Sequence, residues 1–338
     1  FGMADAPWLT IIGLGEDGLS GLTDASREAL ARAELVAGAA RHLALLPDPG
    51  CEVMEWPVPF ADGIAPLLAQ RGRRVVMLAS GDPFWFGAGA SITRHLSAGE
   101  WHALPVASSF SLVAAALGWP LEQVACLGLH AAPLARLRPH LAPGARAIVL
   151  LRDGAALGNL AVWLAGLGFG DSALHVMEAL GGPRERIRST RAGDYALADV
   201  AHPVAVALEV AGNGAALPGV PGRAGSFFSH DGQITRPAIR AMTLAALAPV
   251  AGERLWDIGL GSGAVSIEWL LAHPRCSAIG FEVDPARAAR AAQNAAALGV
   301  ERLHIVQARA PEGLDGQPLP DAVFIGGGLS DALLAHLW

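Results

Sequence analysis

The sequence predicts an α/β protein with two domains joined by a linker. Three observations support this: short apolar runs alternate with Ala- and Leu-rich stretches, two of these runs end in clustered glycines, and a Gly- and Pro-rich segment separates the two regions. With 338 residues the chain is long enough for two domains that each bury a core. The expected domains are residues 8–210 and 226–338, with the linker at 211–225.

The first expected domain alternates strands with helices. Its strand-like apolar runs stand at residues 8–12, 74–79, 147–151, 174–177 and 204–210. Helical stretches lie between these runs, which is typical of a sheet covered by helices. The segment 184–191 alternates in polarity and is expected to form an exposed strand. Its arginines are also candidates for binding an anionic ligand, with a solvated strand face as the alternative.

The expected linker, residues 211–225, is dense in glycine and proline. Proline removes a backbone donor, and glycine loses more conformational entropy on ordering than other residues. Neither a helix nor a central strand is therefore expected in this segment.

The second expected domain opens with a helix and continues as strand, helix, strand, helix, strand, strand. These elements are expected at residues 237–247, 254–258, 265–273, 277–281, 285–298, 304–307 and 322–325. The helix that begins at Pro285 has clear end signals, because Asp284 can cap it and Gly299 can end it. This order predicts a parallel, doubly wound sheet.

A glycine-rich loop follows the first strand of the second domain. The sequence Asp-Ile-Gly-Leu-Gly-Ser-Gly begins at Asp257, and Glu282 ends the next strand. Its glycines, Gly259, Gly261 and Gly263, allow a tight turn on which a nucleotide-like ligand can lie. An acid at Asp257 would repel a pyrophosphate but attract the ammonium and sulfonium groups of S-adenosylmethionine. A dinucleotide site and a plain strand-to-helix turn are the alternatives.

This loop resembles motif I of class I methyltransferases, and Glu282 resembles their ribose-binding acid. The resemblance implies that Thr235 contacts the methyl donor and that Ala310 lies beside the adenine. Relatives carry Gly-Asp-Ala where this chain has Ala308-Arg309-Ala310, so an acid at the adenine is missing. A class I sheet has seven strands and the chain shows four, so a domain without its C-terminal strands is expected.

Three turns of the first domain combine glycines with hydrogen-bonding side chains at strand ends. They contain Gly13 and Gly15, then Ser80, Gly81 and Asp82, and finally Ser108 and Ser109. A glycine turn after a strand is by itself also compatible with a purely structural role. Together, the three turns are expected to line one cleft.

These turns resemble the motifs of the tetrapyrrole methylases, the class III S-adenosylmethionine enzymes of corrin and sirohaem synthesis. The resemblance covers residues 8–210 and implies two α/β lobes with the methyl donor between them. It implies that this donor is held by the seven residues just named. The family often has Gly-x-Gly-Pro-Gly at the first turn, whereas this chain continues with Glu16-Asp17-Gly18.

The two resemblances together imply a methyltransferase of cobalamin synthesis with two S-adenosylmethionine sites. The first domain is expected to methylate a reduced tetrapyrrole at C-5, and the second to methylate C-15 and to decarboxylate the substrate. An activated methyl needs mainly alignment, so no catalytic residue is assigned. Arginine forks suit the substrate's carboxylates, and Arg236 and Arg240 are candidates because they lie one helical turn apart. A solvated helix face is the alternative for this pair, and homo-oligomers are also implied.

Composition disfavours several other classes of protein. The net charge is −7 and no basic stripe is present, which disfavours a nucleic-acid partner. No apolar run approaches the roughly 18 residues of a membrane span. The three cysteines are widely spaced and the histidines lack metal-ligand spacing, so a cytoplasmic protein without a metal is expected.

Four other functions stay open at this point. They are another small-molecule methyltransferase, an NAD-dependent dehydrogenase, a base-modifying nucleic-acid methyltransferase and a nucleotide-sensing module. Asp257 disfavours the dehydrogenase. The run Ile325-Gly326-Gly327-Gly328 stands where base-modifying enzymes usually carry Asn/Asp-Pro-Pro-aromatic.

Overall fold

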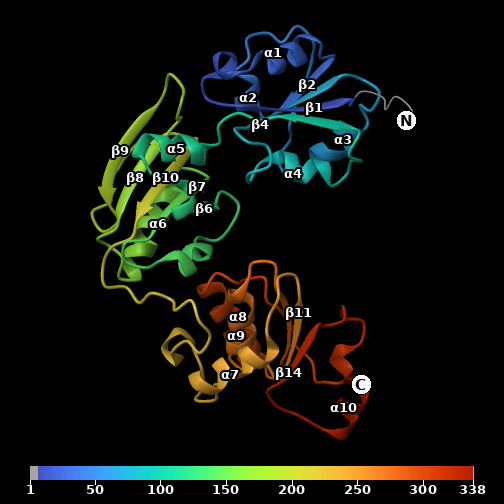
Figure 1. Ribbon diagram of the computed structural model, residues 1–338, viewed down its shortest axis with the longest axis vertical. Helices are drawn as coiled ribbons and strands as arrows, with labels where there is room; N and C mark the ends of the chain where they lie inside the picture. The colour runs from blue at the N-terminus through green and yellow to red at the C-terminus, as the bar shows by residue number, and fades with distance from the viewer. Residues whose placement is uncertain (1–6, 338) are drawn as a thin grey trace. The chain divides into compact units, whose positions relative to one another are not determined.

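The computed structural model describes residues 7–337, which form two compact units (Figure 1). Unit 1 contains the residues up to 131 together with 144–212, and unit 2 contains 132–143 and the residues from 213 onward. The segment 132–143 therefore lies within the first predicted domain in sequence but packs with the second. No helix within residues 7–337 is long and apolar enough to cross a membrane.

The first lobe of unit 1 is a parallel sheet in the order β3-β2-β4-β1-β5. Its strands and helices are β1 (Leu9–Leu14), α1 (Asp24–Ala31), β2 (Leu35–Gly38), α2 (Ala40–Leu43), β3 (Glu52–Glu55), α3 (Ile64–Leu68), β4 (Val75–Ser80), α4 (Ala88–Thr93) and β5 (Trp101–Leu104). The central strands β1 and β4 are almost wholly buried, which explains their continuous apolar sequences. They end side by side, with Leu14 opposite Ser80, so two of the predicted turns meet at one sheet edge.

The second lobe of unit 1 is a mixed sheet in the order β6-β7-β10-β8-β9, in which only β6 and β7 run parallel. Its elements are α5 (Ser109–Leu117), β6 (Ala125–Gly128), β7 (Arg146–Leu151), α6 (Gly154–Gly166), β8 (Ala173–Glu178), β9 (Arg186–Arg191) and β10 (Val204–Glu209). The edge strand β9 is largely exposed, which confirms the strand predicted there. No strand is predicted from the sequence at β2, β3 or β6, each of which has four residues.

Unit 2 is built on a parallel sheet in the order β13-β12-β11-β14. Its elements are α7 (Pro237–Leu247), β11 (Arg254–Ile258), α8 (Ala264–Ala272), β12 (Ser277–Phe281), α9 (Pro285–Ala297), β13 (His304–Val306), β14 (Ala322–Ile325) and α10 (Asp331–Leu337). The predicted order and sheet type are confirmed. Asp284 caps α9 as predicted, since its Oδ1 accepts hydrogen bonds from the backbone N–H groups of Ala286 and Arg287 at 2.7 and 3.2 Å.

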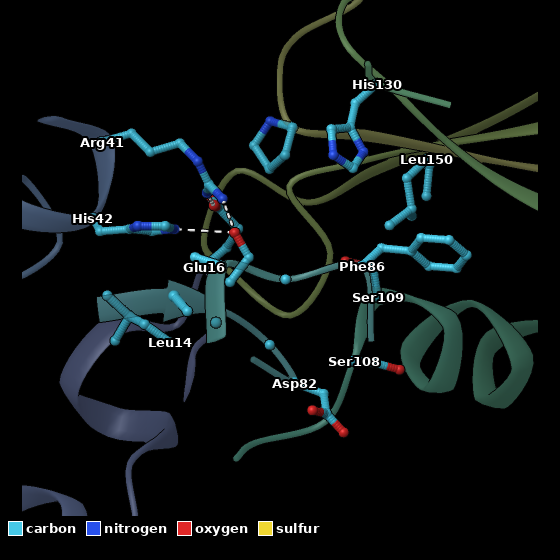
Figure 2. Close-up of a pocket in the computed structure, with 18 of the residues that line it drawn as sticks. Leu14, Glu16, Arg41, His42, Asp82, Phe86, Ser108, Ser109, His130 and Leu150 are labelled. Carbon is cyan, nitrogen blue, oxygen red and sulfur yellow. Dashed lines mark hydrogen bonds and ion pairs between the residues drawn. The ribbon is translucent and has the colours of Figure 1, made fainter. Parts of the chain in front are cut away.

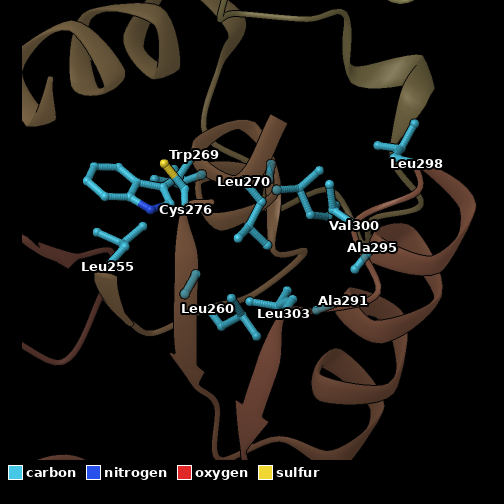
Figure 3. Packing of buried hydrophobic residues seen from close by; sticks show 14 of the residues in the cluster. Leu255, Leu260, Trp269, Leu270, Cys276, Ala291, Ala295, Leu298, Val300 and Leu303 are labelled. Atoms are coloured by element: carbon cyan, nitrogen blue, oxygen red, sulfur yellow. The ribbon is translucent and has the colours of Figure 1, made fainter. Parts of the chain in front are cut away.

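The core of unit 2 lies between the sheet and helices α8 and α9 (Figure 3). Trp269 is fully buried in it, and its indole N–H donates to the carbonyl of Ser277 at 3.0 Å. Leu255 and Leu260 contribute from β11 and from the loop that follows it. This packing places the start of α8, and with it the glycine-rich loop, at the carboxyl end of the sheet.

The predicted linker has no helix or strand over residues 211–224, but its end is fixed within unit 2. The backbone N–H groups of Gly222 and Arg223 donate to the carboxylate of Glu268 at 2.7 and 2.9 Å. Arg138, from the segment 132–143, donates to the carbonyl of Ala215 at 2.6 Å. Part of the linker thus belongs to the packed structure of unit 2.

Candidate functional site

A cavity of about 440 Å³ lies between the two lobes of unit 1 (Figure 2). It is lined by six of the seven residues that sequence motifs predict for this domain: Gly15, Ser80, Gly81, Asp82, Ser108 and Ser109. Helix α5 enters from one side, and strands β7, β8 and β10 supply apolar side chains such as Leu150 and Met177. The three turns that are separated in the sequence therefore share one cavity.

Gly13 is the predicted residue that does not line this cavity. It is buried at the sheet edge, and a Cβ built on it would lie 1.9 Å from the carbonyl oxygen of Gly81. The backbone at Gly81 can approach β1 this closely only because residue 13 has no side chain. The structure gives Gly13 a packing role beneath the cavity, not a place on its surface.

Ser80 lies at the centre of a polar cluster that the sequence does not predict. Its Oγ accepts a hydrogen bond from Arg41 and lies 3.0 Å from Nε2 of His42. An arginine can only donate, whereas the tautomer of His42 decides whether Nε2 or the Ser80 hydroxyl is the donor in the second contact. Burial, together with the charge of Arg41, lowers the pKa of His42 to about 3, which keeps this ring neutral.

Glu16 holds two arginines at the same end of the cavity. Its carboxylate lies 2.6 Å from Arg41 and 2.9 Å from Arg184, and its side chain is 9% exposed. Glu16 stands where relatives often carry proline. This departure from the family motif could have indicated a role for Glu16. The arginines that it pairs with are distant in the sequence, so the cluster itself is not predicted.

Ser108 and Asp82 use side-chain oxygens to fix local backbone. The Ser108 hydroxyl caps α5 by accepting from the N–H of Ser111 at 3.1 Å. Asp82 Oδ1 accepts from the N–H of Phe84 at 2.8 Å. These bonds make the rim of the cavity rigid, while Ser109 in the first turn of α5 stays partly exposed.

The glycine-rich loop of unit 2 contains three glycines in the left-handed region, with φ of 78° at Gly259, 57° at Gly261 and 77° at Gly263. They have different surroundings. A Cβ on Gly259 would lie 2.8 Å from the backbone N of Gly327, and one on Gly263 would lie 3.1 Å from Ala291. A Cβ on Gly261 would meet only the loop's own backbone, at 4.0 Å, so this glycine faces open space.

Asp257 lies beneath this loop and is 1% exposed. Its Oδ2 accepts from the hydroxyl and the N–H of Ser266 at 2.7 and 3.2 Å, but its Oδ1 has no partner within the described chain. Burial raises the pKa of Asp257 to about 7; the hydrogen bonds from Ser266 oppose this shift and the charge of Glu282 adds to it. A buried oxygen without a donor is costly, and a cationic ligand group would satisfy it.

Glu282 lies above the loop, at the end of the neighbouring strand. Its two carboxylate oxygens accept from the N–H of Gly261 at 2.8 Å and from the N–H of Asp284 at 2.9 Å. Because β11 and β12 are parallel neighbours, Asp257, Gly261 and Glu282 lie at the same end of the sheet. Ala310 is half-buried and packs against the cluster that contains Leu314.

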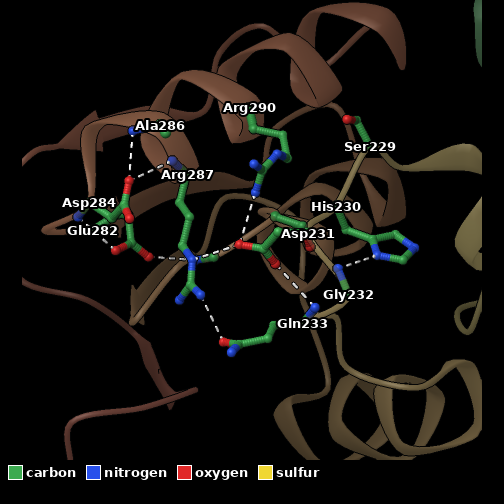
Figure 4. A network of polar contacts seen from close by, with 12 residues as sticks. Ser229, His230, Asp231, Gly232, Gln233, Glu282, Asp284, Ala286, Arg287 and Arg290 are labelled. Carbon is green, nitrogen blue, oxygen red and sulfur yellow. Dashed lines mark hydrogen bonds and ion pairs between the residues drawn. The ribbon is translucent and has the colours of Figure 1, made fainter.

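A network on α9 fixes the segment that leads to Thr235 (Figure 4). The Asp231 carboxylate lies 2.9 Å from Arg287 and 3.1 Å from Arg290, and Arg287 also donates to the side chain of Gln233 at 2.9 Å. A hydrogen bond from the backbone of Gln233 and the two arginines lower the pKa of Asp231 to about 2. The same helix that follows Glu282 thus holds the chain that precedes Thr235.

The prediction that Arg240 binds substrate is wrong. Its side chain is fully buried, lies 2.9 Å from Glu268, and donates to the carbonyls of Thr235 and Arg223. Because the side chain of Arg240 is fully buried, it presents no atom to a ligand at the surface. Arg236, at the start of α7, is exposed.

Comparisons with known proteins agree with the two-domain arrangement. Residues 8–196 match the family described as Tetrapyrrole (Corrin/Porphyrin) Methylases, and residues 226–338 match a Precorrin methyltransferase domain. The Precorrin-6Y C(5,15)-methyltransferase (decarboxylating) of Sinorhizobium sp is 48% identical over 331 residues, which are 96% of this chain and 80% of that protein. The enzyme of the same name from Mycobacterium tuberculosis (strain ATCC 25618 / H37Rv) is 38% identical over 95% of this chain and 81% of its own.

One solved structure with high sequence identity covers part of the chain. It is the C-terminal domain of precorrin-6Y C5,15-methyltransferase from Rhodobacter capsulatus, 52% identical over 36% of this chain and 66% of that chain, with a TM-score of 0.35.

Proposed function

Because the chain belongs to the precorrin-6Y C(5,15)-methyltransferase (decarboxylating) family, we propose that it methylates a precorrin at C-5 and C-15 and removes the carboxyl of the C-12 acetate. The product would be precorrin-8, and S-adenosylmethionine would supply both methyl groups. The observation that carries this proposal is that each of the two units holds its own set of polar groups at strand ends. C-5 methylation is assigned to unit 1, and C-15 methylation with decarboxylation to unit 2.

The residues of unit 2 fit the methyl donor. The unpartnered Oδ1 of Asp257 is a buried acceptor, and an ammonium group would both satisfy it and favour the ionised carboxylate. Glu282 can accept from two ribose hydroxyls, and the open side of Gly261 leaves room for the ligand between these two acids. We propose that Thr235 and Ala310 contact the remainder of the donor, and that Gly259 and Gly263 shape the loop.

The residues of unit 1 fit the same donor in a different way. The turn at Gly81 and the carboxylate of Asp82 lie on one wall, and Ser109 at the start of α5 lies on another. We propose that Gly15, Ser80, Gly81, Asp82, Ser108 and Ser109 form the donor site, with Gly13 supporting it from below. This makes two donor sites in one chain.

The bound donor supplies a methyl group that is already activated for attack by a carbon nucleophile. The chain's own residues therefore act mainly by alignment. In unit 1 the apolar side chains of Leu150, Met177 and Leu180 exclude water from one side of the cavity. Arg41 presents a cation to the same cavity, where it can hold a carboxylate of the substrate.

The proposal is tested by incubating the protein with methyl-labelled S-adenosylmethionine and precorrin-6Y. Two labelled methyl groups per macrocycle and one molecule of carbon dioxide are expected. Binding without methyl transfer would favour a sensing module, and enhanced nicotinamide fluorescence on mixing with NADH would favour a dehydrogenase. Either result would contradict the proposal.

A further inference from the structure

Phe86 has a backbone conformation that a bulky side chain rarely adopts. Its φ is 57°, in the left-handed region, where a residue with a Cβ is strained. Its ring is 51% exposed, so burial of the ring does not offset this strain. Strained backbone is concentrated at functional sites.

The turn that carries Phe86 is fixed on both sides. Asp82 accepts from the N–H of Phe84 at 2.8 Å, and the carbonyl of Pro83 accepts from the N–H of Gly89 at 2.9 Å. Gly87 is required next to Phe86, because a Cβ there would lie 2.6 Å from the carbonyl oxygen of Pro83. Phe86 is therefore held in its conformation by its neighbours.

The ring of Phe86 reaches from the first lobe to the second. It lies against Gly128 at the end of β6, where a Cβ would come within 2.8 Å of the ring. Its centroid is 5.8 Å from that of Phe110, which is fully buried in α5. One face of the ring is thus supported, and the ring lines the cavity between the lobes.

The cavity has two chemically different sides (Figure 2). Phe86 lies with Leu150 on one side, and on the other lie His42 and the ion pair of Arg41 with Glu16, in which Arg41 keeps further N–H donors for a ligand. A flat conjugated ring that carries carboxylates on its rim matches both sides, since the ring can stack on an aromatic face while a carboxylate pairs with a guanidinium. S-adenosylmethionine also has a flat adenine and one carboxylate, and the binding measurements below separate the two ligands.

We propose that Phe86 is a substrate-positioning residue whose ring stacks on the tetrapyrrole macrocycle during methyl transfer in unit 1. This inference rests on the proposed function. The strained backbone at Phe86 directs its ring into the cavity. There the ring fixes the distance between the macrocycle and the methyl donor. The stacking contact strengthens substrate binding and does not stabilise the free protein.

The test compares Phe86→Leu with Phe84→Leu in the full chain. Phe84 is the matched control, because it is exposed on the same turn and its ring packs at a tilt against Trp101, outside the cavity lining. Loss of an aromatic stack is expected to raise the KM for precorrin-6Y at C-5 by about 5- to 10-fold in Phe86→Leu. The Kd for S-adenosylhomocysteine should stay within about twofold of the wild-type value in both variants.

A second pair of variants tests the strain itself. In most positions alanine is more stable than glycine, but at a φ of 57° the order should reverse. Phe86→Gly should therefore melt at a higher temperature than Phe86→Ala, while both show the same rise in KM.

Three results would overturn the inference. An unchanged KM in Phe86→Leu would remove the stacking role, and a weakened Kd for S-adenosylhomocysteine would assign the ring to the donor. A higher melting temperature for Phe86→Ala than for Phe86→Gly would remove the strain argument. If the wild-type protein transfers no methyl group at all, the proposed function fails first, and the inference fails with it.

Discussion

The two proposed donor sites are assembled in different ways. In unit 2, Asp257, the glycine-rich loop and Glu282 come from two adjacent parallel strands within 26 residues of sequence. In unit 1, the cavity takes its lining from both lobes, between Leu14 and Ala205. A site formed at the ends of neighbouring strands can be recognised as a sequence motif. The residues of a site formed between two sheets are distant in the sequence, so they can be identified only from the three-dimensional structure.

In both sites burial favours the neutral form of a titratable group, and the two pKa values therefore shift in opposite directions. Burial raises the pKa of Asp257 to about 7 and lowers that of His42 to about 3. The two units should therefore respond to acid in opposite ways.

The largest expected effect is a loss of stability in one of the two units. Arg240→Ala leaves the buried carboxylate of Glu268 with its two backbone donors but without its ion-pair partner, so the free energy of unfolding of unit 2 should fall by about 3–5 kcal/mol. Calorimetric unfolding of the full chain should show a shift in the transition of unit 2 and none in that of unit 1. Arg236→Ala, four residues earlier and exposed, is the control and should change stability by less than about 0.5 kcal/mol. Equal effects of the two substitutions would contradict the account.

The pH dependence is the next largest effect. The folded state holds fewer protons at His42 than the unfolded state between about pH 3 and 6.5, so acidification to pH 5 should cost unit 1 about 2 kcal/mol. It holds more protons at Asp257 between about pH 4 and 7, so acidification from pH 7 to 5 should stabilise unit 2 by about 2 kcal/mol. His42→Gln should remove the first dependence and Asp257→Asn the second, as measured by calorimetry at several pH values. A pH response that survives in either variant would show that another group causes it.

The smallest expected effect concerns the segment before Thr235. Asp231→Asn weakens the contacts with Arg287 and Arg290 at the surface of α9. Since exposed ion pairs contribute little, the Kd of S-adenosylhomocysteine for unit 2 should rise only about two- to threefold. Asp171→Asn, in an exposed pair of unit 1, serves as the control and should leave this Kd unchanged. A Kd for unit 2 that is the same in both variants would show that the segment needs no support from α9.

Much of unit 2 is predictable from its sequence. The bounds of α7, β11, β12 and β14 agree with the predicted ranges, since each is limited by clear end signals. The acids Asp257 and Glu282 are found because the motif is contiguous and the strands are parallel neighbours. In unit 1 the three turns are predicted, but Arg41 and His42 are not, because α2 carries no motif and reaches the cavity only through the fold.

The errors have physical causes as well. Arg240 and Arg236 lie one turn apart, yet they differ completely in exposure, because Glu268 on α8 fixes one of them in the interior. Arg240 and Glu268 are 28 residues apart, so their ion pair cannot be predicted from the sequence. Gly13 is predicted as a ligand residue because it lies in a glycine turn, but the requirement for glycine comes from the carbonyl of Gly81.

The number of donor sites tests the central claim most directly. Titration calorimetry with S-adenosylhomocysteine should give two sites per wild-type chain and one site in Asp257→Ala, because that substitution removes the buried acceptor of unit 2 alone. A single site in the wild-type chain, or the same number of sites in the variant, would contradict the account.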